Sequence, residues 1–333
     1  MIAATVLGRP AETRAVAAFV RSTSAWPSGC VLEGEAGIGK TTVWLAAVDA
    51  AVGEGIRVVS ARAAEAESVL AYAALADLLG DVDSDLWARI PTPQRLALDR
   101  VLLRGNAVDV VTDPRLVAAG FLSLIERLEK TAPVLLAIDD LQWLDSSSRQ
   151  VIAFAVRRLS GRVGVLATVR NSLGSGGDPS WLQLHNLAEV HRIPLGPLSL
   201  GGLRAVVSER LGRSFSRLAM VRMYDVSRGN PFYALELARV VGDGVIRADV
   251  GLPGSLAELV RRRMGSLPVE VQSALLAASC LSAPTVELVA RATGHDAHRV
   301  VNLLADAEDK GIVSIDGHRL NFTHPLLARG VYA

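Results

Sequence analysis

A glycine-rich octapeptide, GEAGIGKT at residues 34–41, combines residue types and spacing that suit phosphate chemistry. It matches G-x-x-x-x-G-K-[S/T], in which glycines allow backbone N–H groups to turn toward phosphate oxygens. Lys40 supplies a compact charge for the β- and γ-phosphates, and the Thr41 hydroxyl is placed to bind Mg²⁺. The pattern predicts a nucleotide site with the following contacts: Glu35, Ala36, Gly37, Ile38, Gly39, Lys40, Thr41 and Thr42.

The neighbouring residues supply the elements that must position such a loop. The apolar run 29–33 predicts a strand before it, and an amphipathic pattern over 40–52 predicts a helix after it, whose N-terminus favours anions. The alternative is a glycine-rich turn that arose by chance, which this strand–loop–helix context disfavours. Only 3 of the 35 basic residues are lysines, so a lysine at this position stands out.

A second chemical signal is an apolar strand, 134–138, that runs directly into Asp139 and Asp140. Open α/β sheets bind ligands at the carboxyl ends of their strands. We therefore expect Asp139 to hold Mg²⁺ and Asp140 to orient the attacking water or accept its proton. The alternative is a solvated acidic turn that caps the next helix, and Asp145 before three serines has the form of such a cap.

Other candidates have ordinary alternatives. Arg170 ends the predicted strand 163–169 and would sense the γ-phosphate if that strand lies beside Asp139, but with 32 arginines a plain surface residue is the competing interpretation. Arg157 and Arg158 end a helix, where a solvated helix end is favoured over a finger toward another subunit. Pro231 suits a first helical turn as well as a surface for adenine. A lone His324 is typical of a packed or capping residue.

The elements alternate in the first half of the chain and become helical in the second. Predicted strands at 29–33, 56–60, 134–138, 163–169 and 190–195 are separated by helical patterns, which indicates a parallel sheet covered on both faces. Glycine-rich segments at 171–180 and 242–255 predict a loop and a linker. Helices near 255–264, 268–279, 285–292 and 296–309 precede a hairpin joined across Asp316-Gly317, an order that predicts a winged helix.

Composition excludes several classes of protein. The chain has 333 residues, half of them apolar, so it can fold into two or three domains rather than remain disordered. A net charge of +1 removes the overall basic field of a dedicated nucleic-acid binder, and two cysteines cannot build a disulfide framework. With no run long enough to span a membrane and no signal-peptide pattern, we expect a soluble, cytoplasmic protein without a membrane partner.

Together with the segments VLGRPAETRAV, VLLAIDDLQWLD, ATVR, GNPFYALELAR and FTHPLLARGVYA, the phosphate loop makes this chain resemble the signal-transduction ATPases with numerous domains. It looks most like the N-terminal half of large bacterial LuxR-type transcriptional regulators related to the maltose activator. The resemblance extends from about Val6 to Ala333. It implies a P-loop nucleotide-binding domain over 1–197, a helical lid domain over 198–250 and a winged-helix domain over 251–333.

The resemblance also implies a mechanism. Leu7, Gly8 and Arg9 would flank the adenine, Pro231 would contact it, and His324 would approach the β-phosphate of bound ADP. ADP would hold a closed monomer, and exchange for ATP, helped by an inducer, would permit self-association. Inducer-binding repeats and a DNA-binding helix-turn-helix would follow Ala333, so this segment alone would bind nucleotide but not promoter DNA.

Three functional classes remain open: a slow ATP/ADP switch, a DNA-engaging motor or loader ATPase, and a phosphotransferase. The candidate recognition helix 296–310 carries four acidic and two basic residues, and 311–333 carries one acidic and two basic residues, a net charge of −1 overall. Because DNA affinity depends on neutralising phosphates, this charge favours an intramolecular clamp over a DNA grip. The phosphotransferase is weakest because no acceptor site is recognisable.

Overall fold

The computed structural model describes residues 6–80, 82, 84–103, 113–170, 182, 189–241, 267–281, 283–309, 312–322, 327, 328 and 331. Its internal contacts divide the chain into two units. The first comprises residues 1–35 and 39–196. The second comprises 197–333 together with residues 36–38, the tip of the predicted phosphate loop. The predicted loop 171–180, the linker 242–255, the helix 255–264 and His324 lie outside the described residues.

The first unit is built on a parallel five-stranded sheet in the order β2-β3-β4-β1-β5. All five strands were predicted, to within two residues at each end. Their bounds are β1 Ser28–Gly34, β2 Arg57–Arg62, β3 Val134–Asp139, β4 Val163–Arg170 and β5 Glu189–Pro194. Strands β1, β3 and β4 are nearly continuous apolar runs, buried throughout except near their carboxyl ends, as parallel strands covered on both faces must be.

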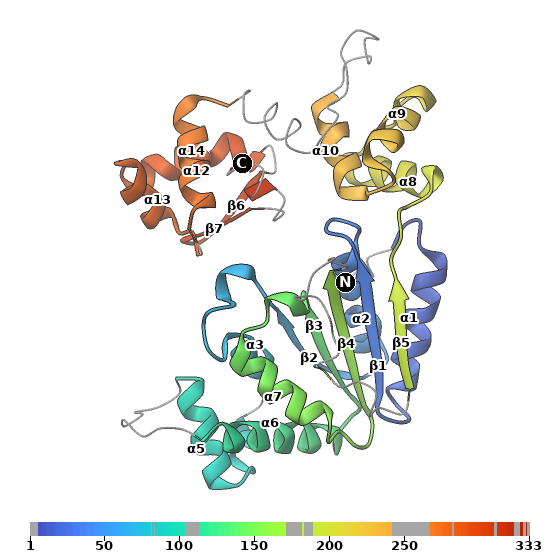
Figure 1. Cartoon of the computed structure of the whole chain (residues 1–333), viewed down its shortest axis with the longest axis vertical. Coiled ribbons are helices and arrows are strands. Elements are labelled where there is room, and N and C mark those ends of the chain that lie inside the picture. Colours follow the sequence, from blue (N-terminus) through green and yellow to red (C-terminus); the bar gives the residue numbers. More distant parts are fainter. Residues whose placement is uncertain are drawn as a thin grey trace. The chain divides into compact units, whose positions relative to one another are not determined.

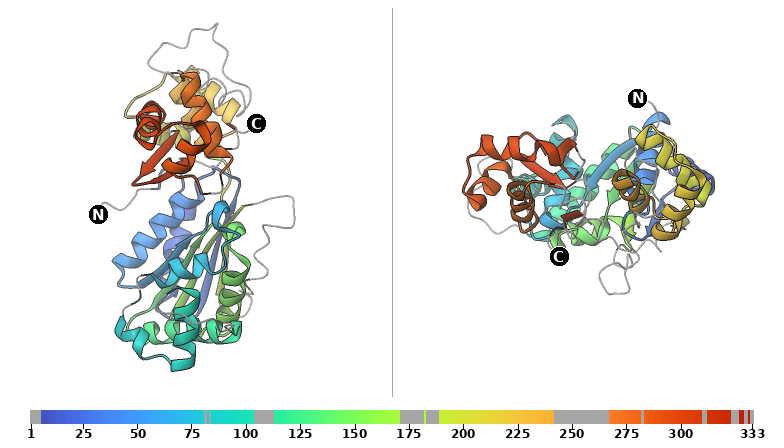
Figure 2. Two further views of the ribbon diagram at one scale, coloured as in Figure 1. Left: turned by 90° about the vertical axis from the view of Figure 1, so that its left-hand side faces the viewer. Right: turned by 90° about the horizontal axis from the view of Figure 1, so that it is seen from above.

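Helices cover both faces of this sheet (Figure 1 and the left view of Figure 2). α1 (Pro10–Ser22) and α2 (Lys40–Gly53) pack together on one face, and α3 (Ala73–Leu79), α6 (Pro114–Glu129) and α7 (Ser146–Val156) on the other. α5 (Thr92–Val101) packs on α6, where a Cβ on Gly120 would meet the Leu98 side chain at 2.9 Å. The sequence patterns missed α1 and the short α4 (Ser84–Ala88). The α1 helix starts at Pro10, a favoured first helical residue.

The strand order brings three chain segments to one edge of the sheet. β4 lies between β3 and β1, with Ile138 opposite Ala167 and Leu32 opposite Thr168. Parallel strands end at the same edge, so the ends of β1, β3 and β4 present the phosphate loop, the two aspartates and Arg170 side by side. The condition for the predicted role of Arg170, that its strand neighbours the Asp139 strand, is therefore met, and the role itself stays a prediction.

The second unit contains two groups of helices, each with its own apolar core. α8 (Leu200–Leu211), α9 (Arg217–Ser227) and α10 (Pro231–Val241) enclose one core around Leu203, Met223 and Leu237. Ser199 and Ser216 cap α8 and α9 by accepting hydrogen bonds from backbone N–H groups three residues later. Both caps precede apolar helical patterns, which is why these helices were predictable from the sequence.

The second group comprises α12 (Val269–Ser279), α13 (Val286–Thr293), α14 (Ala297–Asp309) and the hairpin β6 (Val313–Asp316) and β7 (Arg319–Phe322). The predicted turn needs a correction. Asp316 pairs with Arg319, so the two-residue loop is Gly317-His318 rather than Asp316-Gly317. Gly317 takes a φ of +59°, which suits glycine at the first position of a hairpin loop. The winged-helix assignment stays a prediction.

Candidate nucleotide-binding site

The phosphate loop joins β1 to α2 through two glycines in left-handed conformations. Gly37 has a φ of +76° and Gly39 a φ of +102°, which side chains rarely adopt. The Lys40 side chain folds back along the loop, and its Nζ donates to the carbonyls of Gly34 at 3.0 Å and Glu35 at 2.9 Å. Lys40 is only 6% exposed. The loop therefore holds its cation close to its own backbone.

Burial sets the electrostatics of this lysine. It lowers the pKa of Lys40, and the nearby Asp140 carboxylate acts against this effect while the Arg170 guanidinium adds to it. Asp139 and Glu35 also act on Lys40, so two cations and three carboxylates influence each other within this part of the first unit. An anion that entered here would gain from both cations, as the phosphates of a nucleotide require.

Asp139, at the end of β3, connects the phosphate loop to the neighbouring strand β4. Its Oδ2 accepts a hydrogen bond from Thr41 Oγ1 at 2.9 Å, and its Oδ1 accepts one from Thr168 Oγ1 at 2.6 Å. Burial raises the pKa of Asp139, while the Thr168 hydrogen bond acts in the opposite direction. The Arg62 guanidinium, on β2, lies 3.8 Å from the same Oδ2. Both carboxylate oxygens are therefore fixed by neighbours.

The chemistry of this pair fits a magnesium ion. Mg²⁺ prefers oxygen ligands in an octahedron with bonds of about 2.1 Å, which places adjacent ligands about 3.0 Å apart. The Thr41 and Asp139 oxygens are 2.9 Å apart. A cation would also relieve the cost of burying the Asp139 carboxylate. Among the described residues no group of three or more metal-ligating side chains exists, so the nucleotide phosphates and water would supply the other ligands.

Asp140 occupies a conformation that is uncommon outside glycine, with φ +57° and ψ +56°. Its backbone N–H donates to Thr168 Oγ1 at 2.7 Å, which ties it to β4. Its Oδ1 accepts a hydrogen bond of 2.7 Å from Gln142 Nε2 and lies 4.0 Å from Arg170 Nε. Left-handed residues of this kind cluster at functional sites, where the surrounding structure enforces them.

The three predicted residues near the N-terminus lie at the same end of the sheet. Gly8 has a φ of +73°, and Arg9 is 4% exposed. Arg9 Nη2 donates to Gly196 O at 2.8 Å, and its Nη1 lies 3.1 Å from Glu12 Oε1. A Cβ built on Gly39 would lie 4.0 Å from Arg9 Nε, so Arg9 comes close to the loop. Leu7 is half-buried.

Comparison with protein families supports the interpretation of this region as a nucleotide-binding domain. Residues 5–167 match the model of the AAA ATPase domain. Residues 5–167 thus have the sequence pattern of an AAA ATPase domain. The match covers the phosphate loop, the two aspartates and most of β4, and it agrees with the α/β fold of the first unit. The individual site roles and the resemblance to LuxR-type regulators are finer than this match and stay predictions. A search of the curated proteins found no match.

Three solved structures are similar to this chain at low sequence identity. The Orc1 protein of Aeropyrum pernix in complex with DNA is 15% identical, with 98% of this chain and 92% of that chain covered and a TM-score of 0.46. The Thermotoga maritima RuvB Holliday junction branch migration motor is 13% identical, with 95% and 92% covered and a TM-score of 0.43. The AMPPCP-bound DnaA of Aquifex aeolicus is 15% identical, with 91% and 88% covered and a TM-score of 0.37.

Within the second unit, the loop tip meets the start of α10. Asn230 Nδ2 donates to Ala36 O at 3.0 Å, and the Phe232 N–H donates to Gly37 O at 3.3 Å. Asn230 Oδ1 accepts from the backbone N–H of Phe232 at 3.1 Å, so one side chain caps α10 and holds the loop. Pro231 is buried at the first position of α10. The role predicted for His324 lies outside the described residues.

Sequence patterns did not single out Thr168, Gln142 or Asn230 as site residues. Thr168 lies near the carboxyl end of the apolar strand β4, two residues before Arg170, and a hydroxyl in that place was a usable signal. Asn230 precedes a proline at a helix start, where an asparagine is usually read as a cap alone. Gln142 carried no local signal, because its contact with the Arg170 N–H on β4 depends on how β4 packs beside β3. Arg158, considered as a finger, lies with its guanidinium 3.6 Å from the centre of the Phe154 ring.

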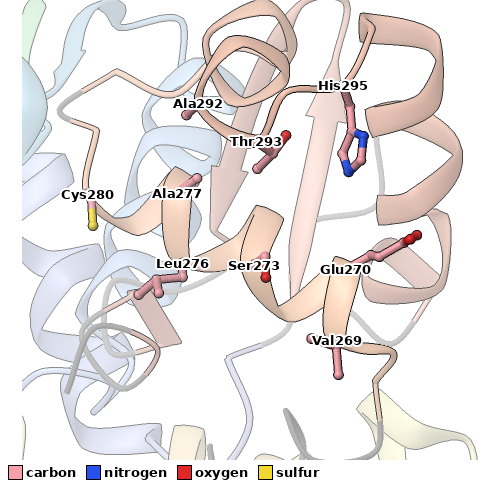
Figure 3. Close-up of a pocket in the computed structure, with 9 residues that line it drawn as sticks. All are labelled: Val269, Glu270, Ser273, Leu276, Ala277, Cys280, Ala292, Thr293 and His295. Atoms are coloured by element: carbon pink, nitrogen blue, oxygen red, sulfur yellow. The ribbon is translucent and has the colours of Figure 1, made fainter.

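A separate pocket of about 410 Å³ occurs in the second unit (Figure 3). It is lined by residues of α12, α13 and the segments that follow them, and none of the predicted site residues is among them. Cys280 and His295 lie at opposite sides of this pocket in the figure, so they do not form a metal-binding pair. No helix in the described parts of the chain is long and apolar enough to cross a membrane.

Proposed function

We propose that this chain is the ATP/ADP-binding switch of a signal-responsive transcriptional regulator. ATP hydrolysis would be slow and would act as a timer rather than as a source of mechanical work. The observation that carries the proposal is the connected set of hydrogen bonds from Thr41 through Asp139 and Thr168 to Asp140. It ties the residues predicted to bind phosphate and metal to the residue predicted to act on water.

Each residue in this set has a distinct task. Lys40 and the loop N–H groups would bind the β- and γ-phosphates, and Thr41 and Asp139 would hold Mg²⁺. When bound, the ion would neutralise charge on those phosphates. Asp140 would accept a proton from the attacking water, and Arg170 would contact the γ-phosphate and respond to its loss. Asp140 is one methylene shorter than a glutamate, which agrees with slow hydrolysis.

The switch itself would depend on contacts with the adenine and with the β-phosphate. Leu7, Gly8 and Arg9 would flank the adenine and Pro231 would contact it, while His324 would approach the β-phosphate of ADP. ADP would hold a closed resting state, and ATP would favour self-association. An inducer or protein partner would act through further repeats. Support comes from the order of the motifs and from the position of Arg9 near Gly39.

The first test is to denature the purified protein and identify the nucleotide it releases. About one ADP per chain is the expected result, because a closed, product-bound state retains its ligand through purification. Titration of Mg²⁺·ATP and Mg²⁺·ADP into nucleotide-free protein then gives the affinities. A protein that neither releases nor binds adenine nucleotide would contradict the proposal.

The clasp is tested separately by substitution at His324. His324→Ala is expected to speed ADP release several-fold, because the β-phosphate would lose a contact. Replacement of the exposed His298 of α14 by alanine is the matched control and should leave release unchanged. An unaltered ADP off-rate in the His324 variant would remove the clasp from the proposal but leave nucleotide binding standing.

The DNA-engaging motor remains the competing class, and salt dependence separates the two. We expect no detectable binding to random duplex at physiological ionic strength, because residues 296–333 carry a net charge of −1. A micromolar complex whose affinity falls steeply with added salt would favour the motor or loader.

A further inference from the structure

The side chain of Gln142 makes hydrogen bonds to both Asp140 and Arg170, the residues predicted to act on water and to sense the γ-phosphate. Gln142 Nε2 donates to Asp140 Oδ1 at 2.7 Å, and Gln142 Oε1 accepts from the backbone N–H of Arg170 at 3.2 Å. Gln142 is therefore bonded at once to the residue expected to act on water and to the strand end that carries the expected phosphate sensor.

The chemistry of the partners fixes the orientation of this amide. An ionised carboxylate can only accept hydrogen bonds, and a backbone N–H can only donate. The amide must then turn its nitrogen to Asp140 and its oxygen to Arg170, because the reverse orientation would leave both contacts unmade. Rotation of the Gln142 amide or of the Asp140 carboxylate would therefore break a hydrogen bond.

The backbone beneath Gln142 is anchored on both sides. The residue belongs to a short 3₁₀ segment, Leu141–Trp143, which follows the left-handed Asp140. Leu141 is 1% exposed and Leu144 is 4% exposed, and both belong to the apolar core of the first unit. The Trp143 N–H donates to Asp140 O at 2.9 Å. The glutamine thus projects from a fixed support.

The contacts also distinguish the two oxygens of Asp140. Oδ1 takes the Gln142 hydrogen bond and lies 4.0 Å from Arg170 Nε. In the described part of the chain no donor reaches Oδ2. Each carboxylate oxygen offers two lone pairs. One of those on Oδ1 is taken by Gln142, so Oδ2 is the oxygen with more room to accept a hydrogen bond from water.

We propose that Gln142 is a positioning residue, which holds Asp140 Oδ1 so that Oδ2 faces the attacking water and which joins that carboxylate to the end of β4. The inference rests on the proposed function, since it assigns Asp140 a role in hydrolysis. Gln142 touches neither phosphate nor water in this role. It acts on the rate of the chemical step and not on nucleotide affinity.

The test compares three variants of the full chain by single-turnover hydrolysis of Mg²⁺·ATP and by nucleotide titration. Gln142→Met keeps the length of the side chain but makes neither hydrogen bond. Gln142→Glu keeps an acceptor for the Arg170 N–H but loses the donor to Asp140. Gln150→Met, at an exposed position of α7, is the control.

We expect both Gln142 variants to lower the hydrolysis rate about tenfold or more while ATP and ADP affinities stay within about twofold. A Gln142→Met rate within twofold of the parent would overturn the proposal, and so would a parallel loss of affinity and melting temperature. A Gln142→Glu variant with the parent rate would also overturn it, because the bond to Asp140 would then be dispensable. If the parent protein itself binds or hydrolyses no ATP, the proposed function fails instead.

Discussion

Thr41 Oγ1 donates a hydrogen bond of 2.9 Å to Asp139 Oδ2, although the two residues are 98 positions apart in the chain. The first residue ends the phosphate loop and the second ends β3, which is separated from β1 by β4. This contact places the two predicted magnesium ligands at the spacing of neighbouring ligands around one ion. It is the point at which two separate sequence motifs become one site.

The first prediction concerns the loop cation. Lys40→Ala is expected to weaken ATP and ADP binding by about 1.5–3 kcal/mol, which is about 10- to 150-fold, because a charge-assisted contact to phosphate is lost. Titration calorimetry measures the change. Lys130→Ala, at an exposed helix end, is the control. Equal affinities in parent and Lys40 variant would remove this residue from the site.

The second prediction concerns the buried carboxylate. Burial raises the pKa of Asp139. The folded protein therefore binds a proton there more readily than the unfolded chain. The contribution of this carboxyl to the stability of the fold is greatest below its ordinary pKa of about 3.8, and it is lost as the pH rises through the higher folded pKa. In nucleotide-free protein without Mg²⁺, Asp139→Asn should avoid this loss.

The expected gain for Asp139→Asn at pH 7 is about 1 kcal/mol, or roughly 2–4 °C in melting temperature. The gain should shrink as the pH approaches about 4, where the parent carboxyl is protonated. The same variant should lose Mg²⁺-dependent hydrolysis. Thermal melts from pH 4 to pH 8 test the first part, and a variant that is less stable at every pH would contradict it.

The third prediction separates backbone strain from crowding. Gly37 and Gly55 have φ values of +76° and +75°, but only Gly37 has a close neighbour, with the Phe232 Cβ 2.7 Å from where its own Cβ would lie. Gly55→Ala should therefore cost only the left-handed strain, about 1–2 kcal/mol. Gly37→Ala should cost more and should also weaken nucleotide binding. Similar losses in both would show that the Phe232 contact does not matter.

The fourth prediction tests the asparagine that meets the loop tip. Asn230→Asp keeps the oxygen that caps α10 but replaces the amide donor to Ala36 O with a second acceptor. We expect nucleotide affinity to fall by about 1–2 kcal/mol, roughly 5- to 30-fold, with helix content unchanged by circular dichroism. Asn302→Asp, at an exposed position of α14, is the control. Unchanged affinity would limit Asn230 to its capping role.

The fifth prediction concerns Asp145, which caps two helices at once. Its Oδ1 accepts from the backbone N–H groups of Ser148 and Tyr72, and its Oδ2 from that of Ala74. Asp145→Ala would leave buried donors of both α7 and α3 without partners, at a cost of about 2–4 kcal/mol by urea unfolding.

Asp113 offers the comparison, because it caps α6 at an exposed site through a single bond to the Arg115 N–H. Asp113→Ala should cost only about 1 kcal/mol. Comparable costs at the two positions would mean that the bonds from Asp145 to α3 contribute nothing.

Local patterns predicted most of the described elements correctly and singled out the phosphate loop and the two aspartates as candidate site residues. The run Val134–Asp139 reads as a buried strand because consecutive apolar residues fit only an element covered on both faces. The phosphate loop, Asp139 and Asp140 were visible because their chemistry depends on neighbours in the chain. α1 was missed because its short apolar pattern follows a glycine and a proline, which usually mark a turn.

The sequence by itself determined which residues could bind phosphate, hold a cation and end each strand, because those properties follow from side-chain type and short-range spacing. Only the tertiary structure decided that Thr41 meets Asp139, that Gln142 joins Asp140 to Arg170, and that Asn230 holds Ala36. These contacts depend on the strand order and on how separate segments pack together. The physical reason is that a hydrogen bond needs its atoms placed to within a few tenths of an ångström, and no local pattern encodes the relative position of residues that lie 28, 98 and 194 places apart.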